Sequence, residues 1–322
     1  MHDIHFQNER YAAREGESVL DCLLRNGFAM PHSCKSGVCQ SCIMRAVSGT
    51  IPAKAQTGLR DTLRAQGYVL ACCFVPEGDV EIALIDTALL RTPGSIESID
   101  PLNATVVRVR VRTEKPIEYR PGQYVNLVRA DGLVRSYSLA SVPEEDELLE
   151  LHVAAVPGGR MSGWMHRRDG LGAQVALLGP VGNCFYVPGN AHQPIFLAGT
   201  NTGLAPLYGI VRDALRRGHE GPIHLFHGAI RPEGLYLADE LRAMASRNAN
   251  VHYYASVLQG EADGVATVPL DQFSLQTVPK LSGHKVYLCG HPDFVRIMQR
   301  KTFLAGASLS DIYADAFVPS PE

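Results

Sequence analysis

The sequence lacks three features that would each point to a different class of protein. Its 30 basic and 33 acidic side chains give a net charge of −3, so no excess of positive charge suggests nucleic acid as a partner. No apolar run approaches the roughly 18–20 residues that cross a bilayer, so we expect no membrane partner. Residues 1–5 include no basic segment leading into an apolar one. We therefore expect no export and a cytoplasmic location.

Two common nucleotide-binding motifs are also missing. The sequence contains neither a G-x-G-x-x-G fingerprint nor a P-loop Gly-Lys-Ser/Thr. Its eight cysteines would suit a disulfide framework only in a short secreted chain, whereas 322 residues are enough for two or three domains. The cysteines are therefore better explained as four metal ligands and four thiols in a reducing compartment.

Four of the cysteines have a diagnostic spacing. Cys34, Cys39, Cys42 and Cys72 give C-x4-C-x2-C-x29-C, which is typical of the ligands of a plant-type [2Fe–2S] cluster. Structural zinc usually takes paired C-x2-C knuckles, and only one such pair is present, while a disulfide is the weakest alternative. Cys73 competes with Cys72 for the fourth position, but the segment up to Cys72 resembles the L-x-C segment of plant-type ferredoxins. Cys73 would then be a buried or neighbouring thiol.

The rest of the chain divides by its periodicity. Ser18 and Asp21 predict a capped helix that ends near Asn26, residues 68–85 return to strand character, and residues 89–101 are interpreted as a linker. From about 103 to 187 the period is mostly two, which predicts an antiparallel barrel or sandwich. The arginines of residues 107–112 are interpreted as a solvated strand face rather than a basic patch.

Strands alternate with helices from about residue 192 onward. The pattern predicts strands at 195–198, 224–226, 251–254 and 285–288, with helices after the first, second and last of them. This order is typical of a parallel sheet with crossover helices.

A strand segment of the middle region carries a recognisable motif. Arg135-Ser136-Tyr137-Ser138 resembles the R-x-Y-S motif of the ferredoxin–NADP reductase superfamily. The resemblance implies that Arg135 neutralises a flavin phosphate, Tyr137 packs on the flavin and Ser138 lies near its N5. Guanidinium suits phosphate, which agrees with this role, although an exposed strand could hold these residues by chance.

Three further segments match the same superfamily in order and spacing. Gly122-Gln123-Tyr124-Val125 resembles its G-Q-Y/F strand, and residues 179–182 match its G-P-x-G turn. Residues 158–162 resemble its G-x-x-S phosphate turn, which opens a helix whose free amides suit a pyrophosphate. The resemblance assigns Gly159, Met161 and Ser162 to flavin binding.

The last region resembles the superfamily's nucleotide segment. Residues 198–206 are similar to the loop G-T-G-T-G-x-A-P, which assigns the pyrophosphate of a dinucleotide to Gly199, Thr200, Thr202 and Gly203. Asn201 replaces the middle glycine, and asparagine tolerates positive φ better than most residues. Pro206 suits the first helical turn.

Two segments near the C-terminus complete the predicted catalytic set. Cys289-Gly290 resembles the family's C-G-P motif, in which the cysteine lies by the nicotinamide, with His291 inserted before the proline. A small buried hydrophobe is the alternative for Cys289. Residues 313–317 resemble a tail that brings an aromatic side chain to the flavin, so Phe317 is either a gate or core packing. Ser138, Cys289 and Phe317 are the predicted catalytic residues.

The resemblance extends over almost the whole chain. It implies a plant-type ferredoxin domain with a β-grasp fold (1–90), an FAD-binding antiparallel β-barrel (100–190) and a Rossmann-like NAD(P)-binding α/β domain (191–322). The chain resembles the reductase components of bacterial multicomponent oxygenases, for aromatic-ring dioxygenases or diiron monooxygenases. Arg231 could meet a 2′-phosphate, but Glu233 favours NADH.

The implied activity is electron transfer in the catabolism of aromatic compounds. NADH would give hydride to FAD, which would release single electrons through the [2Fe–2S] cluster to a terminal oxygenase or a ferredoxin. Two alternatives remain: a stand-alone NAD(P)H diaphorase or ferric reductase, and a redox-sensing binding protein with little turnover.

Overall fold

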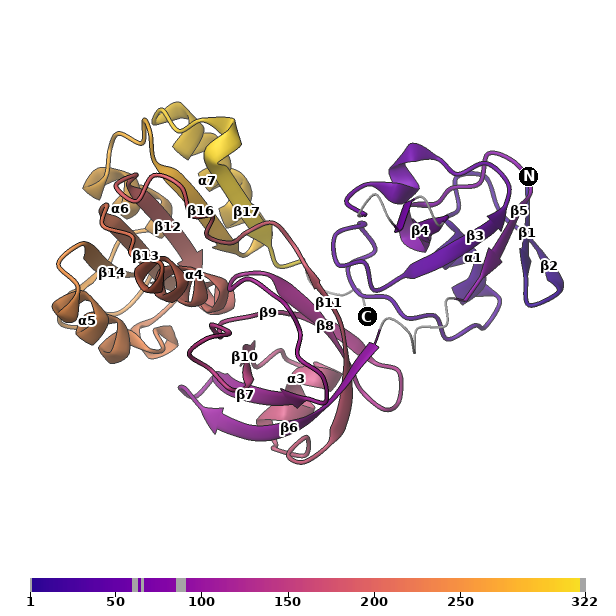
Figure 1. Cartoon of the computed structure of the whole chain (residues 1–322), viewed down its shortest axis with the longest axis horizontal. Coiled ribbons are helices and arrows are strands. Elements are labelled where there is room, and N and C mark those ends of the chain that lie inside the picture. Colours follow the sequence, from indigo (N-terminus) through magenta and orange to yellow (C-terminus); the bar gives the residue numbers. More distant parts are fainter. Residues whose placement is uncertain (1, 60–62, 65–66, 85–90, 319–322) are drawn as a thin grey trace.

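Three separate β-sheets organise the part of the protein that the structure describes (Figure 1). The computed structural model describes residues 2–59, 63–64, 67–84 and 91–318. We call the three parts the first lobe (the sheet of β1–β5), the barrel (β6–β11) and the third lobe (β12–β17). The order of a small mixed sheet, an antiparallel barrel and a parallel sheet confirms the predicted fold class.

The first lobe packs helix α1 and the cysteine loop against a small sheet. The strand order is β2-β1-β5-β3-β4, with β1 parallel to β5 and the other pairs antiparallel. Ser18 caps helix α1 by accepting from the Asp21 amide at 3.1 Å, as the sequence predicts. The elements are β1 (Asp3–Phe6), β2 (Glu9–Ala12), α1 (Val19–Arg25), β3 (Ile43–Ser48), β4 (Tyr68–Leu70) and β5 (Val80–Ala83).

The barrel is an antiparallel sheet in the order β10-β7-β6-β11-β8-β9. A bridge between Leu139, just after β9, and Leu151 of β10 brings the two edges of the sheet together. Alternate residues of the strands therefore point into a single core. The elements are β6 (Arg91–Pro101), β7 (Val106–Thr113), β8 (Tyr124–Val128), β9 (Val134–Ser138), β10 (Leu149–Ala154), α3 (Arg160–His166) and β11 (Gln174–Val181).

Strand β6 corrects the predicted linker. Residues 91–101 form the longest strand of the barrel and pair with both β7 and β11, so the linker interpretation is wrong there. Residues 89 and 90 lie outside the described residues. Ile96 and Ile99 are both buried, but a bulge between Ile96 and Ser98 separates them by three positions. The bulge breaks the alternation that would have marked a strand.

The arginines of β7 also differ from the prediction. Arg112 is half exposed, as expected, but the side chain of Arg108 retains only 18% of its exposure. Arg108 forms ion pairs with Glu150 of β10 at 3.2 Å and with Glu240 of the third lobe at 3.6 Å. The solvated-face interpretation is therefore wrong for Arg108, because the third lobe covers that part of the barrel.

The third lobe has a parallel sheet in the order β15-β14-β13-β12-β16-β17. Helices α4 and α5 pack on one face, and α6 and α7 on the other. The strands are β12 (Ile195–Thr200), β13 (Ile223–Ala229), β14 (Val251–Val257), β15 (Val265–Ala266), β16 (Lys285–Gly290) and β17 (Ile312–Ala316). The helices are α4 (Leu204–Arg216), α5 (Ala238–Arg247), α6 (Leu270–Thr277) and α7 (Pro292–Leu304).

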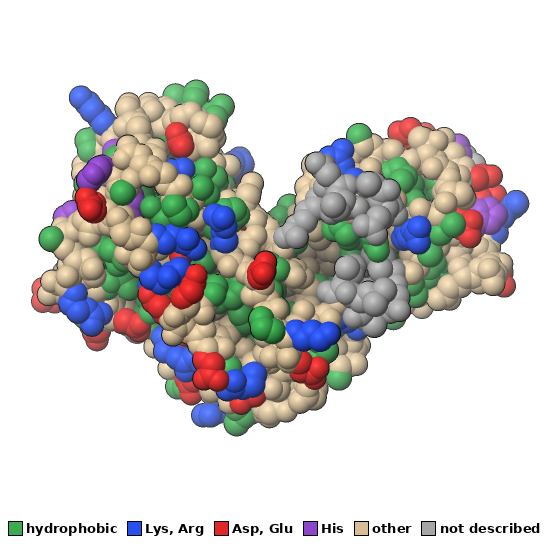
Figure 2. All heavy atoms as spheres, in the orientation of Figure 1, with side chains coloured by type: hydrophobic (Ala, Val, Ile, Leu, Met, Phe, Trp, Pro, Cys, Tyr) green, Lys and Arg blue, Asp and Glu red, His purple; other side chains and the backbone are tan. Residues whose placement is uncertain are grey.

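The barrel lies between the other two lobes. In the space-filling view the first and third lobes stand apart on either side of a notch, with the barrel beneath both (Figure 2). Within the part of the chain that the structure describes, no helix is both long and apolar enough to cross a membrane.

Candidate functional site

The cysteine loop directs backbone amides at its own sulfurs. The amides of Ser36 and Cys39 each approach Cys34 Sγ to 3.4 Å, and the Cys34 amide lies 3.5 Å from Cys39 Sγ. The Cys39 side chain and these amides outweigh burial and lower the pKa of the Cys34 thiol to about 4. Ser41 Oγ lies 3.0 Å from Cys39 Sγ. The same interaction with Cys34, followed by burial, raises the pKa of Cys39, so the loop favours a thiolate, the form that binds iron, at Cys34.

The four predicted ligands form two pairs of interacting thiols. Cys34 interacts with Cys39, and Cys42 is the main influence on Cys72, whose pKa it raises together with burial. Two thiolates per iron is the arrangement in a cluster with four cysteine ligands. Across the described residues, no three His, Cys, Asp or Glu side chains converge as ligands of a single metal ion. The thiol pairs and the amides therefore fit a [2Fe–2S] cluster.

Gly37 and Cys73 show how the second half of the site is built. Gly37 has φ of 80°, and a Cβ there would lie 2.6 Å from Cys73 Sγ. The Gly37 backbone instead hydrogen-bonds to Cys72, which supports Cys72 as the ligand. Cys73 Sγ lies 3.7 Å from Cys72 Sγ, and its side chain is half-buried.

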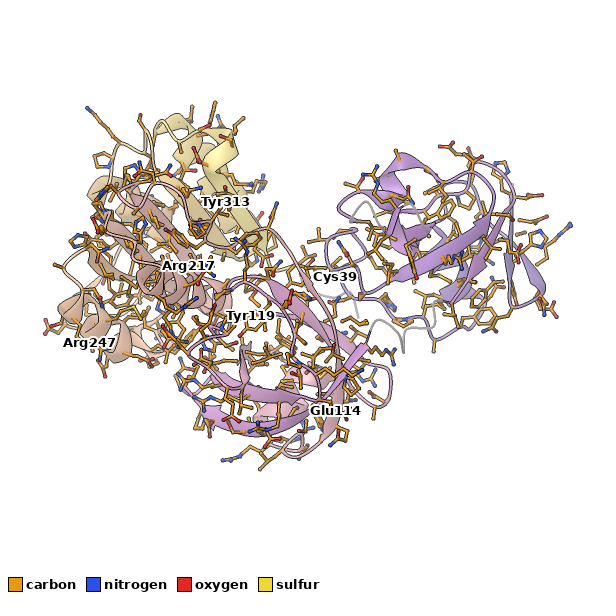
Figure 3. The ribbon with its side chains drawn as sticks, in the orientation of Figure 1. Cys39, Glu114, Tyr119, Arg217, Arg247 and Tyr313 are labelled. Atoms are coloured by element: carbon orange, nitrogen blue, oxygen red, sulfur yellow. The ribbon has the colours of Figure 1, made fainter. Side chains whose placement is uncertain are left out.

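The cysteine loop lies directly on the barrel. Asn126 of β8 donates from Nδ2 to the Cys39 carbonyl at 2.6 Å, and the Tyr124 hydroxyl donates to the Val38 carbonyl. Ser136 of β9 donates in turn to Asn126 Oδ1 at 2.7 Å. Figure 3 places Cys39 at the neck where the first lobe meets the barrel. The predicted cluster and the predicted flavin strand are thus joined by hydrogen bonds.

Strand β9 presents its motif residues on opposite faces. Tyr137 packs against the barrel core, whereas Ser138 is buried on the other face, 3.4 Å from Asp315 Oδ2. Arg135 is half-buried and donates to the Val134 carbonyl at 2.8 Å.

The helix of the predicted phosphate turn borders a cationic hollow. The hollow is open, has a volume of about 440 Å³, and is lined by Arg129, Arg160, Arg167 and the backbone of Gly158, Gly159 and Gly163. The three guanidinium groups are paired with carboxylates, Arg129 and Arg160 with Asp131 and Arg167 with Asp169, so a pyrophosphate would have to compete with these ion pairs. Met161 is buried in the barrel core, and Ser162 Oγ accepts from the Val156 amide at 3.2 Å. The Met161 and Ser162 side chains are therefore used by the fold, and their predicted flavin contacts stay a prediction.

The predicted nucleotide turn packs against the end of β16. Gly199 and Cys289 are register partners in adjacent parallel strands. A Cβ on Gly203 would lie 2.3 Å from the Cys289 carbonyl oxygen, and a Cβ on Gly290 would lie 2.5 Å from Thr200 Oγ1. Only glycine fits these positions, and the cradle they form suits the close approach of a dinucleotide phosphate. Thr202 lies in the single 3-10 turn that follows β12.

Asn201 takes the conformation that the missing glycine would have taken. Its φ of 52° lies in the left-handed region, which asparagine tolerates. The turn is therefore preserved despite the substitution. Gly199 and Gly203 remain glycines, and at both positions a Cβ would lie within 3.0 Å of other atoms of the protein.

A second cluster of groups lies where β16, β17 and β9 meet. Asp315 is the register partner of Cys289, and its backbone hydrogen-bonds to the Cys289 thiol. Burial, followed by the Cys184 thiol at 3.6 Å, raises the pKa of Cys289 and keeps it a neutral thiol. Burial raises the pKa of Asp315 to about 6, against the opposing effect of Ser138. The Phe317 amide donates to the Gly290 carbonyl at 2.8 Å.

The structure thus brings together Ser138, Cys289 and the strand that leads to Phe317, the three predicted catalytic residues. It adds two residues that the sequence did not single out, Asp315 and Asn126. Asp315 lies within residues 313–317, the segment that resembles the family's tail. It shares the strand face of Tyr313 and Phe317, and this alternation could have identified it as a site residue. No local signal marked Asn126, because its partner is 87 residues away.

Three family models match the chain in the predicted order. Residues 4–77 match the 2Fe-2S iron-sulfur cluster binding domain, residues 95–186 the oxidoreductase FAD-binding domain, and residues 197–300 the oxidoreductase NAD-binding domain. These matches and the fold define the class: an iron–sulfur flavoprotein oxidoreductase with binding domains for a [2Fe–2S] cluster, FAD and NAD.

Similar proteins narrow this class. The ferredoxin–NAD(P)+ reductase component of the naphthalene 1,2-dioxygenase/salicylate 5-hydroxylase systems of a Ralstonia species is 33% identical over 318 residues, covering 96% of this chain and 95% of that protein. The reductase component of the naphthalene 1,2-dioxygenase system of Pseudomonas putida is 32% identical over 315 residues, covering 94% of each. The crystal structure of an Amycolatopsis cytochrome P450 reductase superposes with a TM-score of 0.71 at 28% identity, covering all of both chains.

The chain belongs to the family of ferredoxin–NAD(P)+ reductase components of oxygenase systems. This confirms the predicted resemblance, the three cofactor classes and the activity of an electron-transfer reductase.

Proposed function

We propose that the protein carries electrons from NADH through FAD and a [2Fe–2S] cluster to a partner oxygenase that acts on aromatic compounds, or to a separate ferredoxin. The observation that carries this proposal is the docking of the cysteine loop on the flavin strands, through Asn126 to Cys39. It supports a relay within one chain. The two naphthalene-system relatives support the class of partner.

The chain's own residues would bind and orient the cofactors. When bound, FAD supplies the conversion of a two-electron donor into single electrons, and the cluster supplies a one-electron store. Arg135 and the cationic hollow beside Gly159 would hold the flavin phosphates, with Tyr137 against the ring. Cys34, Cys39, Cys42 and Cys72 would hold the cluster.

The third lobe would position the nicotinamide. We assign the dinucleotide phosphates to the turn from Gly199 to Gly203, and the nicotinamide to Cys289 and Gly290. A neutral thiol at Cys289 adds no charge beside the reacting carbon. Phe317, whose backbone is tied to Gly290, would cover the flavin face until nicotinamide displaces it.

Asp315 gives this site a pH dependence. Its raised pKa of about 6 means that it is neutral below pH 6 and negative above it. Because the flavin gains negative charge when it accepts hydride, ionised Asp315 opposes the step. We expect the rate of flavin reduction by NADH to fall about threefold to tenfold from pH 5 to pH 7.5, with Asp315→Asn nearly flat over this range. Rapid-mixing absorbance measures both profiles, and parallel slopes would exclude this role.

NADH is the proposed donor in preference to NADPH. Arg231 and Glu233 are both exposed after β13, where a 2′-phosphate would lie, and the Glu233 carboxylate opposes a second negative group. We expect kcat/KM for NADH to exceed that for NADPH by about tenfold or more.

A comparison of electron acceptors tests the proposal. The holoprotein is supplied with NADH and either cytochrome c, a one-electron protein acceptor, or a ferric chelate. The proposal predicts that removing the cluster abolishes cytochrome c reduction. Fast turnover on ferric chelate that survives loss of the cluster would instead identify a stand-alone reductase or diaphorase. Failure to bind NADH at high concentration would support the redox-sensing alternative.

The domain limits and the compartment are part of the proposal. The proposed ferredoxin domain covers residues 1–90 and the proposed NAD(P)-binding domain residues 191–322. Strand β6 supports a start of the flavin domain near residue 91 instead of 100. None of the eight cysteines, all of which lie in the described residues, is paired in a disulfide, which agrees with the proposed reducing environment of a cytoplasm.

A further inference from the structure

We infer that Asn126, held in place by Ser136, is a positioning residue for the electron-transfer step between the flavin strand and the cluster loop. The inference rests on the proposed function and deepens it. The relay itself requires only that two cofactors be close. The structure assigns the task of keeping them close to a particular neutral hydrogen-bond chain from Ser136 through Asn126 to Cys39.

The geometry of the chain fixes the orientation of the Asn126 amide. Its Nδ2 lies 2.6 Å from the carbonyl oxygen of Cys39, which can only accept. Its Oδ1 therefore faces Ser136 Oγ, which donates at 2.7 Å. Asn126 and Ser136 are also register partners in β8 and β9. The Cys39 carbonyl thus fixes the orientation of the amide, and the Ser136 hydroxyl pairs the Oδ1 that this orientation leaves on the other side.

The Asn126 side chain is buried although it lies on the outer face of its strand. Val125 and Leu127 point into the barrel core, so Tyr124 and Asn126 lie on the outer face of β8. Asn126 is nevertheless only 2% exposed and Tyr124 only 8%, and both donate to carbonyls of the cysteine loop. A polar group buried at a sheet face is costly unless it is paired. Here both ends of the Asn126 amide are paired.

The two contacts clamp consecutive residues of the cysteine loop. Tyr124 donates to the Val38 carbonyl, and Asn126, two residues along the same face, donates to the Cys39 carbonyl. Two fixed points set both the distance and the tilt of the loop relative to β8. Because Cys39 is an assigned cluster ligand, the clamp acts on the backbone of the ligand itself.

The other end of the chain lies in the flavin motif. Ser136 stands between Arg135 and Tyr137, and Ser138 is two residues further on the same face. Two side chains and two hydrogen bonds therefore connect the strand that would hold the flavin to a ligand of the cluster. Electron transfer falls steeply with distance, so a loose loop would slow this step without affecting the arrival of hydride at the other side of the flavin. The chain is neutral, so the step should be insensitive to salt.

The test separates the two steps in the holoprotein. Wild type, Asn126→Leu and Ser136→Ala are mixed with NADH without oxygen, following flavin absorbance and, by freeze-quenching, the EPR signal of the reduced cluster. We expect flavin reduction within about twofold of wild type in both variants. Cluster reduction should slow by about tenfold or more in Asn126→Leu and by about threefold in Ser136→Ala.

Gln40→Leu is the matched control. Gln40 follows Cys39 directly and donates its side-chain amide to the Gly58 carbonyl at 2.9 Å, within the first lobe. Its loss should leave the rate of cluster reduction unchanged. Reduction of each variant with dithionite gives the full EPR signal if the cluster is intact. If Asn126→Leu loses its cluster, the rate of cluster reduction in Ser136→Ala tests the inference instead, because this variant keeps the Asn126 side chain.

Three results would overturn the inference. Cluster reduction at the wild-type rate in both variants would show that the chain positions nothing. An equal delay in Gln40→Leu would assign the effect to the stability of the loop in general. A delay that disappears at high salt would point to charged docking instead. Failure of NADH to reduce the flavin of the wild type would be a separate result, because it contradicts the proposed function itself.

Discussion

Replacing Cys39 by serine is expected to reduce electron delivery to cytochrome c by about 100-fold or more while leaving flavin reduction by NADH within about twofold. Cys39 lies in the first lobe, whereas the groups assigned to hydride transfer, Ser138 and Cys289, lie in the barrel and the third lobe. Loss of a cluster ligand should therefore stop electron transfer from the flavin through the cluster to the acceptor, and leave hydride transfer to the flavin intact.

This variant isolates the cluster cleanly. Asn126 bonds to the carbonyl of residue 39, which serine keeps, so the loop can stay docked on the barrel. Cys22→Ser is the control, because Cys22 is a buried thiol of the same lobe that lies close to the Ala12 carbonyl and is not an assigned ligand. Rapid-mixing absorbance reports the flavin, and cytochrome c reports the exit. A folded Cys39→Ser protein whose flavin is no longer reduced would contradict the modular relay.

Replacing Gly203 by alanine is expected to reduce NADH turnover with ferricyanide by about 100-fold. The added Cβ would lie 2.3 Å from the carbonyl oxygen of Cys289 and 2.6 Å from its carbonyl carbon. Both atoms belong to the backbone, so no side chain can rotate away. The turn must instead move off β16, and this separates the assigned phosphate cradle from the assigned nicotinamide site.

The same change should cost roughly 1–3 kcal/mol in the free energy of unfolding, because it overpacks a closed contact. Gly189→Ala is the matched control: a Cβ there meets nothing within 4 Å, and its φ is not in the left-handed region. Dithionite should reduce the cluster and give its full EPR signal in both variants. Wild-type turnover with NADH in Gly203→Ala would exclude this turn as the nucleotide site.

Local sequence patterns predicted most of the fold. The cap at Ser18, the alternation of β7 and the strand–helix order after residue 192 all appear where they were expected, because each depends on neighbours in sequence. The failure at β6 has the opposite origin. Its bulge between Ile96 and Ser98 lies in the ladder with β7, the preceding residues also pair with β11, and no local sequence pattern reports such pairing.

The site was less predictable than the fold for the same reason. Arg108 was interpreted as solvated because the partner that covers it, Glu240, is more than a hundred residues away. Asp315 and Asn126 gain their importance from contacts between lobes, with Ser138 and with Cys39. A sequence motif identifies residues that bind a cofactor from one short segment of the chain. It does not identify residues whose partners lie in another lobe, because those partners are distant in sequence.

An anaerobic titration with NADH tests the central claim most directly. The purified holoprotein is titrated with NADH, and separately with NADPH, while flavin absorbance and the EPR signal of the cluster are followed together. We expect NADH to bleach the flavin and to produce the signal of a reduced [2Fe–2S] cluster, and NADPH to do so far more slowly. Intact cofactors that neither nucleotide reduces would contradict the relay from the third lobe through the barrel to the cluster.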